Sequence, residues 1–128
     1  MNYLCLNKNI FLWNNFKIIP IRMKDRNMIM SWRNDQIYHL RQKAKLKRKD
    51  QDLYFKNIVK KQFKEKQPNQ LLFSFIENNL LIGYGGLVHI DWTNKNAEIS
   101  FLMKTELESE RFIELWNIFL KLGQTVEF

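Results

Sequence analysis

One histidine and one glutamate in this chain have the residue types and the spacing for proton transfer. Both lie in the stretch from Leu71 to Met103, which holds three consecutive apolar runs. If Asp91 pairs with Asn96 across the last turn, His89 faces Glu98 directly on the neighbouring strand. A histidine and a carboxylate in that arrangement can take up and release protons. The alternative is an ordinary polar contact on a half-covered face of the sheet.

A second group of polar residues follows the first expected helix. Arg33 and Asn34 stand at the end of that helix, and Arg41 and Gln42 lie in the connection after it. Two guanidinium groups on one connection can bind a phosphate or a carboxylate through paired hydrogen bonds. Arginines are also common on protein surfaces, so this pattern alone does not separate a binding site from a solvated loop.

Three antiparallel strands must position the first pair. The sequence predicts strands at Leu71–Ile76, Leu80–Ile90 and Ala97–Met103, and Asn78-Asn79 suits the first turn because asparagine tolerates positive φ. Alternate residues of a strand share a face. The expected apolar face contains Val88, Ile90, Ala97, Ile99 and Phe101, and the opposite face contains His89, Glu98 and Ser100.

The remaining elements are helices and one short strand. Asp25 is the expected N-cap of the first helix, and Asn34 is expected to end that helix in a left-handed conformation. Together the elements predict one α+β domain over residues 1–128, with an antiparallel sheet flanked by helices. The elements outside the three strands are a strand at Phe16–Arg22 and helices at Asn27–Arg33, Gln36–Gln42, Gln51–Lys66 and Glu106–Leu122.

The composition is that of a globular protein. The chain has 128 residues, of which 45% are hydrophobic, and this suits a single domain with its own core. Cys5 is the only cysteine, so no internal disulfide is expected, and no residue cluster suggests a metal site. No run is long and apolar enough to cross a membrane, and no signal peptide is recognisable. We therefore expect a cytoplasmic protein without a membrane partner.

The positive charge is concentrated in the first half of the chain. Residues 22–66 hold 15 Lys and Arg against 5 Asp and Glu, and five of these cations lie in Lys43–Lys49. Such a region suits the phosphates of a nucleotide, a coenzyme or a nucleic acid. The alternative is codon bias, since 15 of the 21 cations are lysine. The segment has no aromatic residues for base stacking, so we do not expect a nucleic-acid partner.

The glycine-rich run Gly83-Tyr84-Gly85-Gly86 matches no phosphate-binding fingerprint. No helix follows it, and no Gly-Lys-Ser/Thr closes it. Glycines within a strand more often mark a bulge or the close approach of another segment. We expect a structural role for these glycines.

Three segments carry a resemblance to a known family. Ile21–Asn34 contains Arg-x-x-Asp and ends in Trp-Arg-Asn, Leu81–Leu87 reads LIGYGGL, and Asn96–Phe101 reads NAEISF. In this order and spacing they resemble the first strand and helix, the third strand and the fourth strand of the GCN5-related N-acetyltransferases, the GNAT superfamily. Trp-Arg-Asn followed by a polar helix resembles the branch that acetylates nucleotide-linked amino sugars or protein N-termini.

The resemblance implies transfer of an acetyl group from acetyl-CoA, as co-substrate, to a primary amine on a small molecule or a peptide. In this family the fourth strand offers backbone groups to the pantetheine arm, which points to Phe101, Leu102 and Met103. Glu98 is the first candidate for the general base, and His89 is the second. The residues expected at the acceptor are Arg33, Asn34, Arg41 and Gln42.

The chain departs from the family in two ways. The glycine-containing pyrophosphate loop is expected near Lys104–Phe112, where the chain reads KTELESERF, with no glycine and three glutamates. The family's last strands and fourth helix have no counterpart after Leu115–Gln124, so we expect a domain truncated after its third main helix. A second copy of the chain is one way to complete such a sheet. The alternative function is a non-catalytic binding or assembly module that keeps part of the fold.

Overall fold

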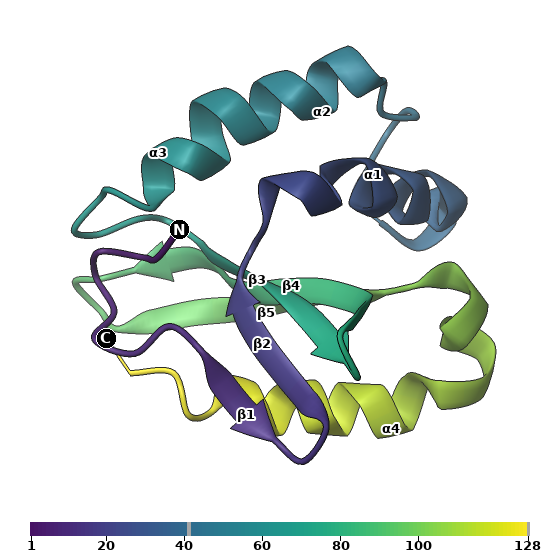
Figure 1. The fold of residues 1–128 in the computed structure, drawn as a ribbon. Coiled ribbons are helices and arrows are strands. Elements are labelled where there is room, and N and C mark those ends of the chain that lie inside the picture. Colours follow the sequence, from purple (N-terminus) through teal and green to yellow (C-terminus); the bar gives the residue numbers. More distant parts are fainter. Residues whose placement is uncertain (41, 128) are drawn as a thin grey trace.

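The computed structural model describes residues 1–40 and 42–127 and contains one antiparallel sheet with helices on both faces (Figure 1). The strands lie in chain order across the sheet, so each pairs with its neighbours in sequence. β1 and β5 are therefore the two edges. The strands are β1 (Phe11–Trp13), β2 (Phe16–Pro20), β3 (Leu71–Glu77), β4 (Leu80–Asp91) and β5 (Asn96–Met103).

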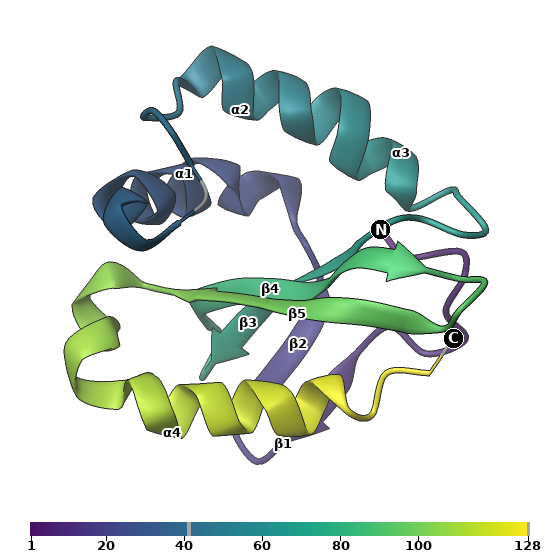
Figure 2. The same ribbon diagram turned by 180° about the vertical axis from the view of Figure 1, so that it is seen from behind.

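The helices form two layers around the sheet. One continuous helical run consists of α2 (Arg48–Tyr54), a π-helical segment (Phe55–Val59) and α3 (Lys60–Gln62). Together with α1 (Arg26–Asp35) it covers one face, and α4 (Thr105–Gly123) covers the other (Figures 1 and 2). The predicted α+β class is confirmed. None of the helices in the described part of the chain has the length and apolar character needed to cross a bilayer.

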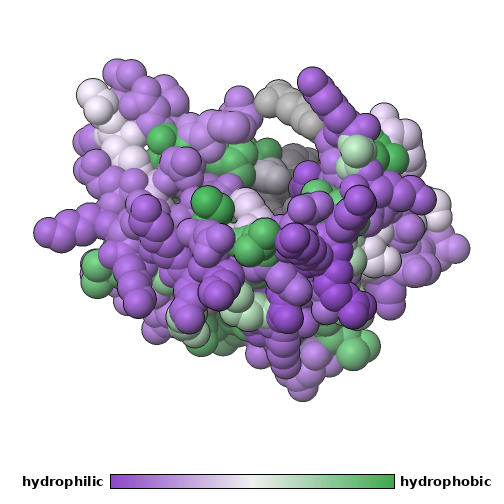
Figure 3. Space-filling view, turned by 90° about the horizontal axis from the view of Figure 1, so that it is seen from above, coloured by the Kyte–Doolittle hydropathy of each residue, from purple (hydrophilic) through white to green (hydrophobic). Residues whose placement is uncertain are grey.

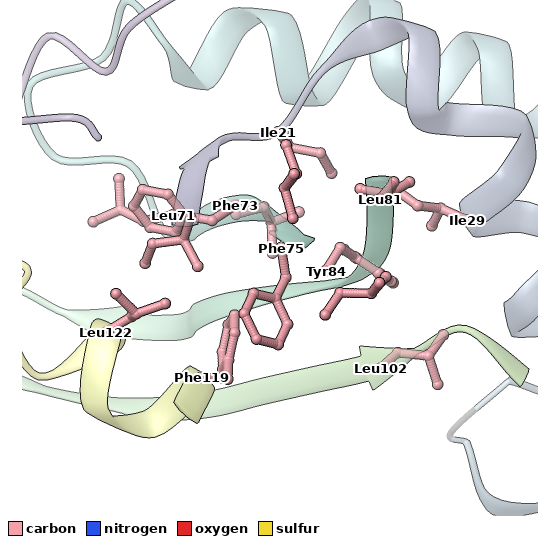
Figure 4. Close-up of a cluster of buried hydrophobic side chains, with 14 of the residues drawn as sticks. Ile21, Ile29, Leu71, Phe73, Phe75, Leu81, Tyr84, Leu102, Phe119 and Leu122 are labelled. Atoms are coloured by element: carbon pink, nitrogen blue, oxygen red, sulfur yellow. The ribbon is translucent and has the colours of Figure 1, made fainter. Parts of the chain in front are cut away.

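The sheet separates two layers of core side chains, because alternate residues of each strand point to opposite faces. On the α4 side, the rings of Phe75 and Phe119 pack with their centroids 5.4 Å apart. On the other side, Ile21 and the α1 residue Ile29 are buried between the sheet and the helices (Figure 4). Burial on both faces explains why β3 is apolar at nearly every position.

Asparagines with positive φ close two of the hairpins. Asn78 and Asn79 have φ values of 50° and 68° between β3 and β4, which confirms the predicted turn. Asn14 has a φ of 52° between β1 and β2, where no hairpin is predicted from the sequence. The sheet consequently has one more strand than the sequence pattern predicts.

Gly85 and Gly86 allow β3, β4 and β5 to approach closely. A Cβ atom on Gly85 would collide with the carbonyl oxygen of Ser100 on β5. Gly86 has a φ of 152°, and a Cβ atom there would collide with the carbonyl oxygen of Leu71 on β3. Only glycine meets both requirements without displacing a neighbouring strand. The structural role predicted for these glycines is confirmed.

Two residues at the ends of α1 differ from expectation. Asp25 precedes the helix but makes no capping hydrogen bond through its side chain. Its buried carboxylate instead accepts hydrogen bonds from Arg22 and from Ser74 Oγ, the latter at 2.9 Å. Asn34 lies inside α1, so the predicted left-handed end at this residue is wrong. The short helix predicted after α1 is a single 3-10 turn, Ile37–His39.

Candidate functional site

A cavity of ≈ 330 Å³ lies between the sheet and the helices α1 and α2. Arg33 of α1, Tyr84 of β4 and Ser100 of β5 contribute polar groups to its wall, and Ile29 and Leu46 contribute apolar groups. Seen from the side of these helices, the surface of the molecule is mostly hydrophilic (Figure 3). A concave site with an apolar lining and a few polar groups is typical of small-molecule binding.

Three of the residues predicted to bind an acceptor form one hydrogen-bonded network at this cavity. Arg33 donates from Nη1 to Tyr84 Oη at 2.8 Å and from Nε to Gln42 Oε1 at 3.1 Å. Gln42 Nε2 in turn donates to Asn34 Oδ1 at 3.1 Å. The structure thus brings Arg33, Asn34 and Gln42 together. The fourth predicted residue, Arg41, lies outside the described residues.

Tyr84 lines the candidate site but is not predicted from the sequence. Burial raises the pKa of its phenol, and the neighbouring Arg33 cation opposes that shift. The phenol therefore stays protonated near neutral pH, and its oxygen accepts the hydrogen bond from Arg33. The only signal in the sequence is a single tyrosine between Gly83 and Gly85, where the glycines rather than the ring attract attention.

His89 and Glu98 lie close together, but the predicted register is wrong. The predicted pairing of Asp91 with Asn96 is present, whereas Glu98 pairs with Val88 instead of His89. The cause is a β-bulge, in which His89 adopts a φ of 51° and one extra residue enters β4. His89 Nε2 lies 3.9 Å from Glu98 Oε2, and the two side chains are 68% and 59% exposed.

The bulge also changes which residues share a face with Glu98. Val88 lies on the same face as Glu98, so the prediction that places it on the opposite, apolar face is wrong. Ser100 shares this face because it follows Glu98 by two positions on β5. Val88 and Ser100 both line the cavity. Glu98 therefore presents a solvent-exposed carboxylate beside the cavity, where it can take a proton from a bound group and pass it to water.

The strand β5 pairs with β4 on one side, and within residues 1–40 and 42–127 no strand pairs with its other side. Its last three residues are Phe101, Leu102 and Met103, for which backbone contacts to a coenzyme are expected. The buried amide of Gln36 donates from Nε2 to the Met103 carbonyl oxygen at 2.9 Å, so the end of α1 holds the end of β5 in place. The coenzyme-binding role of these three residues stays a prediction.

The beginning of α4 is acidic. Glu106 is exposed and Glu108 half-buried in its first turns, and Thr105 Oγ1 donates to Asp35 Oδ2 at 3.1 Å. These carboxylates would repel a pyrophosphate placed there. The residues present therefore fit coenzyme A in part: the open edge of β5 suits the pantetheine arm, whereas the start of α4 does not suit the pyrophosphate.

A protein-family model matches most of the helices and strands described above. The family model described as "Acetyltransferase (GNAT) domain" matches residues 18–122, a span that runs from within β2 almost to the end of α4. The match includes the cavity network, the bulge in β4 and all of β5. A search of curated proteins finds no match to the chain.

Proposed function

Since this chain belongs to the GNAT family of acetyltransferases, we propose that it transfers an acetyl group from acetyl-CoA to a primary amine bound in the cavity. The observation that carries this proposal is the position of Glu98. It is an exposed carboxylate on the edge strand β5, and its neighbours Val88 and Ser100 line the cavity. An amine in the cavity would lie next to both the base and the strand edge.

The roles of the residues follow from the chemistry of amide formation. Acetyl-CoA supplies the acetyl group as a thioester. The amine nitrogen bonds to the acetyl carbon, the carbon–sulfur bond breaks, and the nitrogen loses a proton. Coenzyme A leaves as a thiolate, which takes up a proton from solvent to give the free thiol. We assign this proton to Glu98, with His89 as the second candidate. The backbone groups of Phe101, Leu102 and Met103 are assigned to binding the pantetheine arm, except for the Met103 carbonyl, which already accepts from Gln36 Nε2.

The proposed acceptor is an amino sugar or the N-terminus of a peptide. A volume of ≈ 330 Å³ is at the small end of the range of about 300–1,000 Å³ found for ligand pockets, which suits a single sugar or one or two amino acids. Arg33 at the wall offers N–H donors beyond those that bind Tyr84 and Gln42. The similarity of Trp32-Arg33-Asn34 to the branch that acetylates such amines supports the same choice.

A second candidate function is supported by the surface around β5. Ile99 on β5 and Phe112 and Ile113 on α4 are all exposed, at 52%, 46% and 75%. An exposed apolar surface beside an unpaired strand edge suits pairing with another chain, for example a second copy of this one. The protein would then be an assembly module that keeps the fold without catalysis.

The substitution Glu98→Gln tests the proposed function. Transfer is measured as thiol release from acetyl-CoA, with glucosamine and a short peptide with a free N-terminus as acceptors. If Glu98 takes the proton, its loss lowers the transfer rate by at least about 100-fold. The dissociation constant of acetyl-CoA, measured by calorimetry, stays within about twofold of the original, because the side chain points away from the strand edge.

Two controls make the result decisive. Glu127→Gln removes an exposed carboxylate near the end of the chain and is expected to leave the rate unchanged. His89→Gln is expected to have a smaller effect than Glu98→Gln. A full transfer rate in Glu98→Gln would exclude this residue as the base, and a folded protein that binds no acetyl-CoA would exclude the acetyltransferase function.

A further inference from the structure

A strongly basic segment borders the cavity. It comprises residues 43–49, and its cations are Lys43, Lys45, Lys47, Arg48 and Lys49. All five side chains are exposed, and within the described residues none of them forms an ion pair. The basic segment therefore carries five like charges, and none of them is in direct contact with a carboxylate of the described residues.

Hydrogen bonds hold the backbone of the basic segment in one place. Asn34 binds Leu46 twice: its Oδ1 accepts from the Leu46 N–H at 2.7 Å, and its Nδ2 donates to the Leu46 carbonyl at 3.0 Å. Gln42 Nε2 donates to the Ala44 carbonyl at 2.9 Å. Runs of like charge usually repel one another and stay disordered. Here the network of Arg33, Asn34 and Gln42 fixes the run against α1.

The basic segment is continuous with the wall of the cavity. Leu46, in the middle of the segment, lines the cavity, and so does Asp50, which follows the segment directly. A molecule that fills the cavity and extends outward past Leu46 meets the exposed lysines. The start of α4, with Glu106 and Glu108, has the opposite charge, so the fixed charges favour an anion at the cavity mouth and disfavour one at α4.

We propose that the acceptor of this enzyme carries a phosphate group, which binds the basic segment while the amine lies in the cavity. This inference rests on the proposed function and names the class of its acceptor. A phosphate dianion relieves the repulsion among the lysines and forms charge-assisted hydrogen bonds with them. Because the segment is already ordered, little entropy is lost when it binds. Coenzyme A also carries phosphates, so the test must separate these two sources.

Inorganic pyrophosphate is the probe for the site. The triple variant Lys43→Gln, Lys45→Gln, Lys47→Gln is compared with the control Lys56→Gln, Lys60→Gln, Lys64→Gln. Both lower the net charge equally, from +8 to +5, by three substitutions. We expect calorimetry to show pyrophosphate binding that weakens at least about tenfold in the first variant and less than about threefold in the control. Amide NMR shifts of the original protein should centre on residues 42–50.

Three results would overturn the inference: no pyrophosphate binding, equal weakening in both variants, or shifts centred elsewhere. The dissociation constant of acetyl-CoA is measured for the same proteins and is expected to stay within about twofold in the first variant. A larger increase would assign the basic segment to the coenzyme and overturn the assignment to the acceptor. If the original protein binds no acetyl-CoA, the proposed function fails. If it binds acetyl-CoA but not pyrophosphate, only the present inference fails.

Discussion

Asp25 and Asp52 each pair with an arginine, but only Asp25 is buried. Arg22 donates to Asp25 through Nε and Nη2 at 2.7 and 3.0 Å, and Ser74 Oγ donates to the same carboxylate. We expect Asp25→Ala to lower the free energy of unfolding by about 3 kcal/mol, because it leaves the guanidinium and the buried hydroxyl without their acceptor. Urea denaturation followed by circular dichroism measures this change.

Asp52 provides the matched control. It accepts a hydrogen bond from Arg26 Nε at the same distance of 2.7 Å, but its side chain is 45% exposed, compared with 6% for Asp25. Water therefore replaces the lost contact, and Asp52→Ala should cost less than about 1 kcal/mol. Equal losses in the two variants would contradict the argument that burial, together with the additional hydrogen bonds from Arg22 Nη2 and Ser74 Oγ, makes Asp25 important.

At the scale of single residues, the sequence indicates which side chains are functional candidates better than it indicates which residues they contact. The proximity of His89 to Glu98 is predicted from strand alternation. The bulge that shifts the pairing of Glu98 to Val88 is not predicted, since no glycine marks the residue with positive φ. Asn34 is expected to end a helix and instead binds Leu46. The amide of Gln36, which binds the Met103 carbonyl, has no signal in the sequence, because it connects residues far apart in the chain. Such long-range polar contacts require the folded structure.

At the scale of elements, Gly85 determines how closely β4 and β5 can pack. A Cβ atom there would collide with the Ser100 carbonyl oxygen and lie 2.9 Å from Phe101 Cα and 3.0 Å from Phe119 Cζ. We expect Gly85→Ala to lower the free energy of unfolding by about 3 kcal/mol, because a backbone and not a flexible side chain must move. Thermal denaturation measures the effect.

Gly123, at the end of α4, is the corresponding control. A Cβ atom there has no neighbour within 4 Å, and its φ is not in the left-handed region. Alanine is a better helix former than glycine, so Gly123→Ala should stabilise the protein by about 0.5 kcal/mol. If Gly85→Ala were as harmless, β5 would not be packed against β4 as closely as described.

Local sequence signals predict the turns of this sheet when the same rule is applied to every hairpin. The Asn78-Asn79 turn is predicted because asparagine tolerates positive φ, and Asn14 signals the β1–β2 hairpin by the same chemistry. That hairpin is missed because β1 is only three residues long, too short for a recognisable alternation. The π-helical segment between α2 and α3 has no recognisable signal, since its residues have ordinary helical spacing.

At the scale of the whole molecule, the two edges of the sheet differ in length and surroundings. β1 has three residues and β5 has eight. Long open edges invite pairing with other chains, and proteins usually cover them or place charges on them. β5 carries Glu98 near its beginning, while its last residues, Phe101 to Met103, are uncharged. The uncharged end is the part to which the proposed function assigns the pantetheine arm.

Hydrogen exchange with and without acetyl-CoA tests which partner the β5 edge binds. If the pantetheine arm bonds to the backbone there, saturating acetyl-CoA should slow exchange in residues 99–103 by at least about tenfold. The β1–β2 hairpin, residues 11–20, serves as the internal control and should be unaffected. ADP, which lacks the arm, should give no protection at residues 99–103. Protection that rises with protein concentration in the absence of ligand would instead show a second copy pairing with β5, and would favour the assembly module over the enzyme.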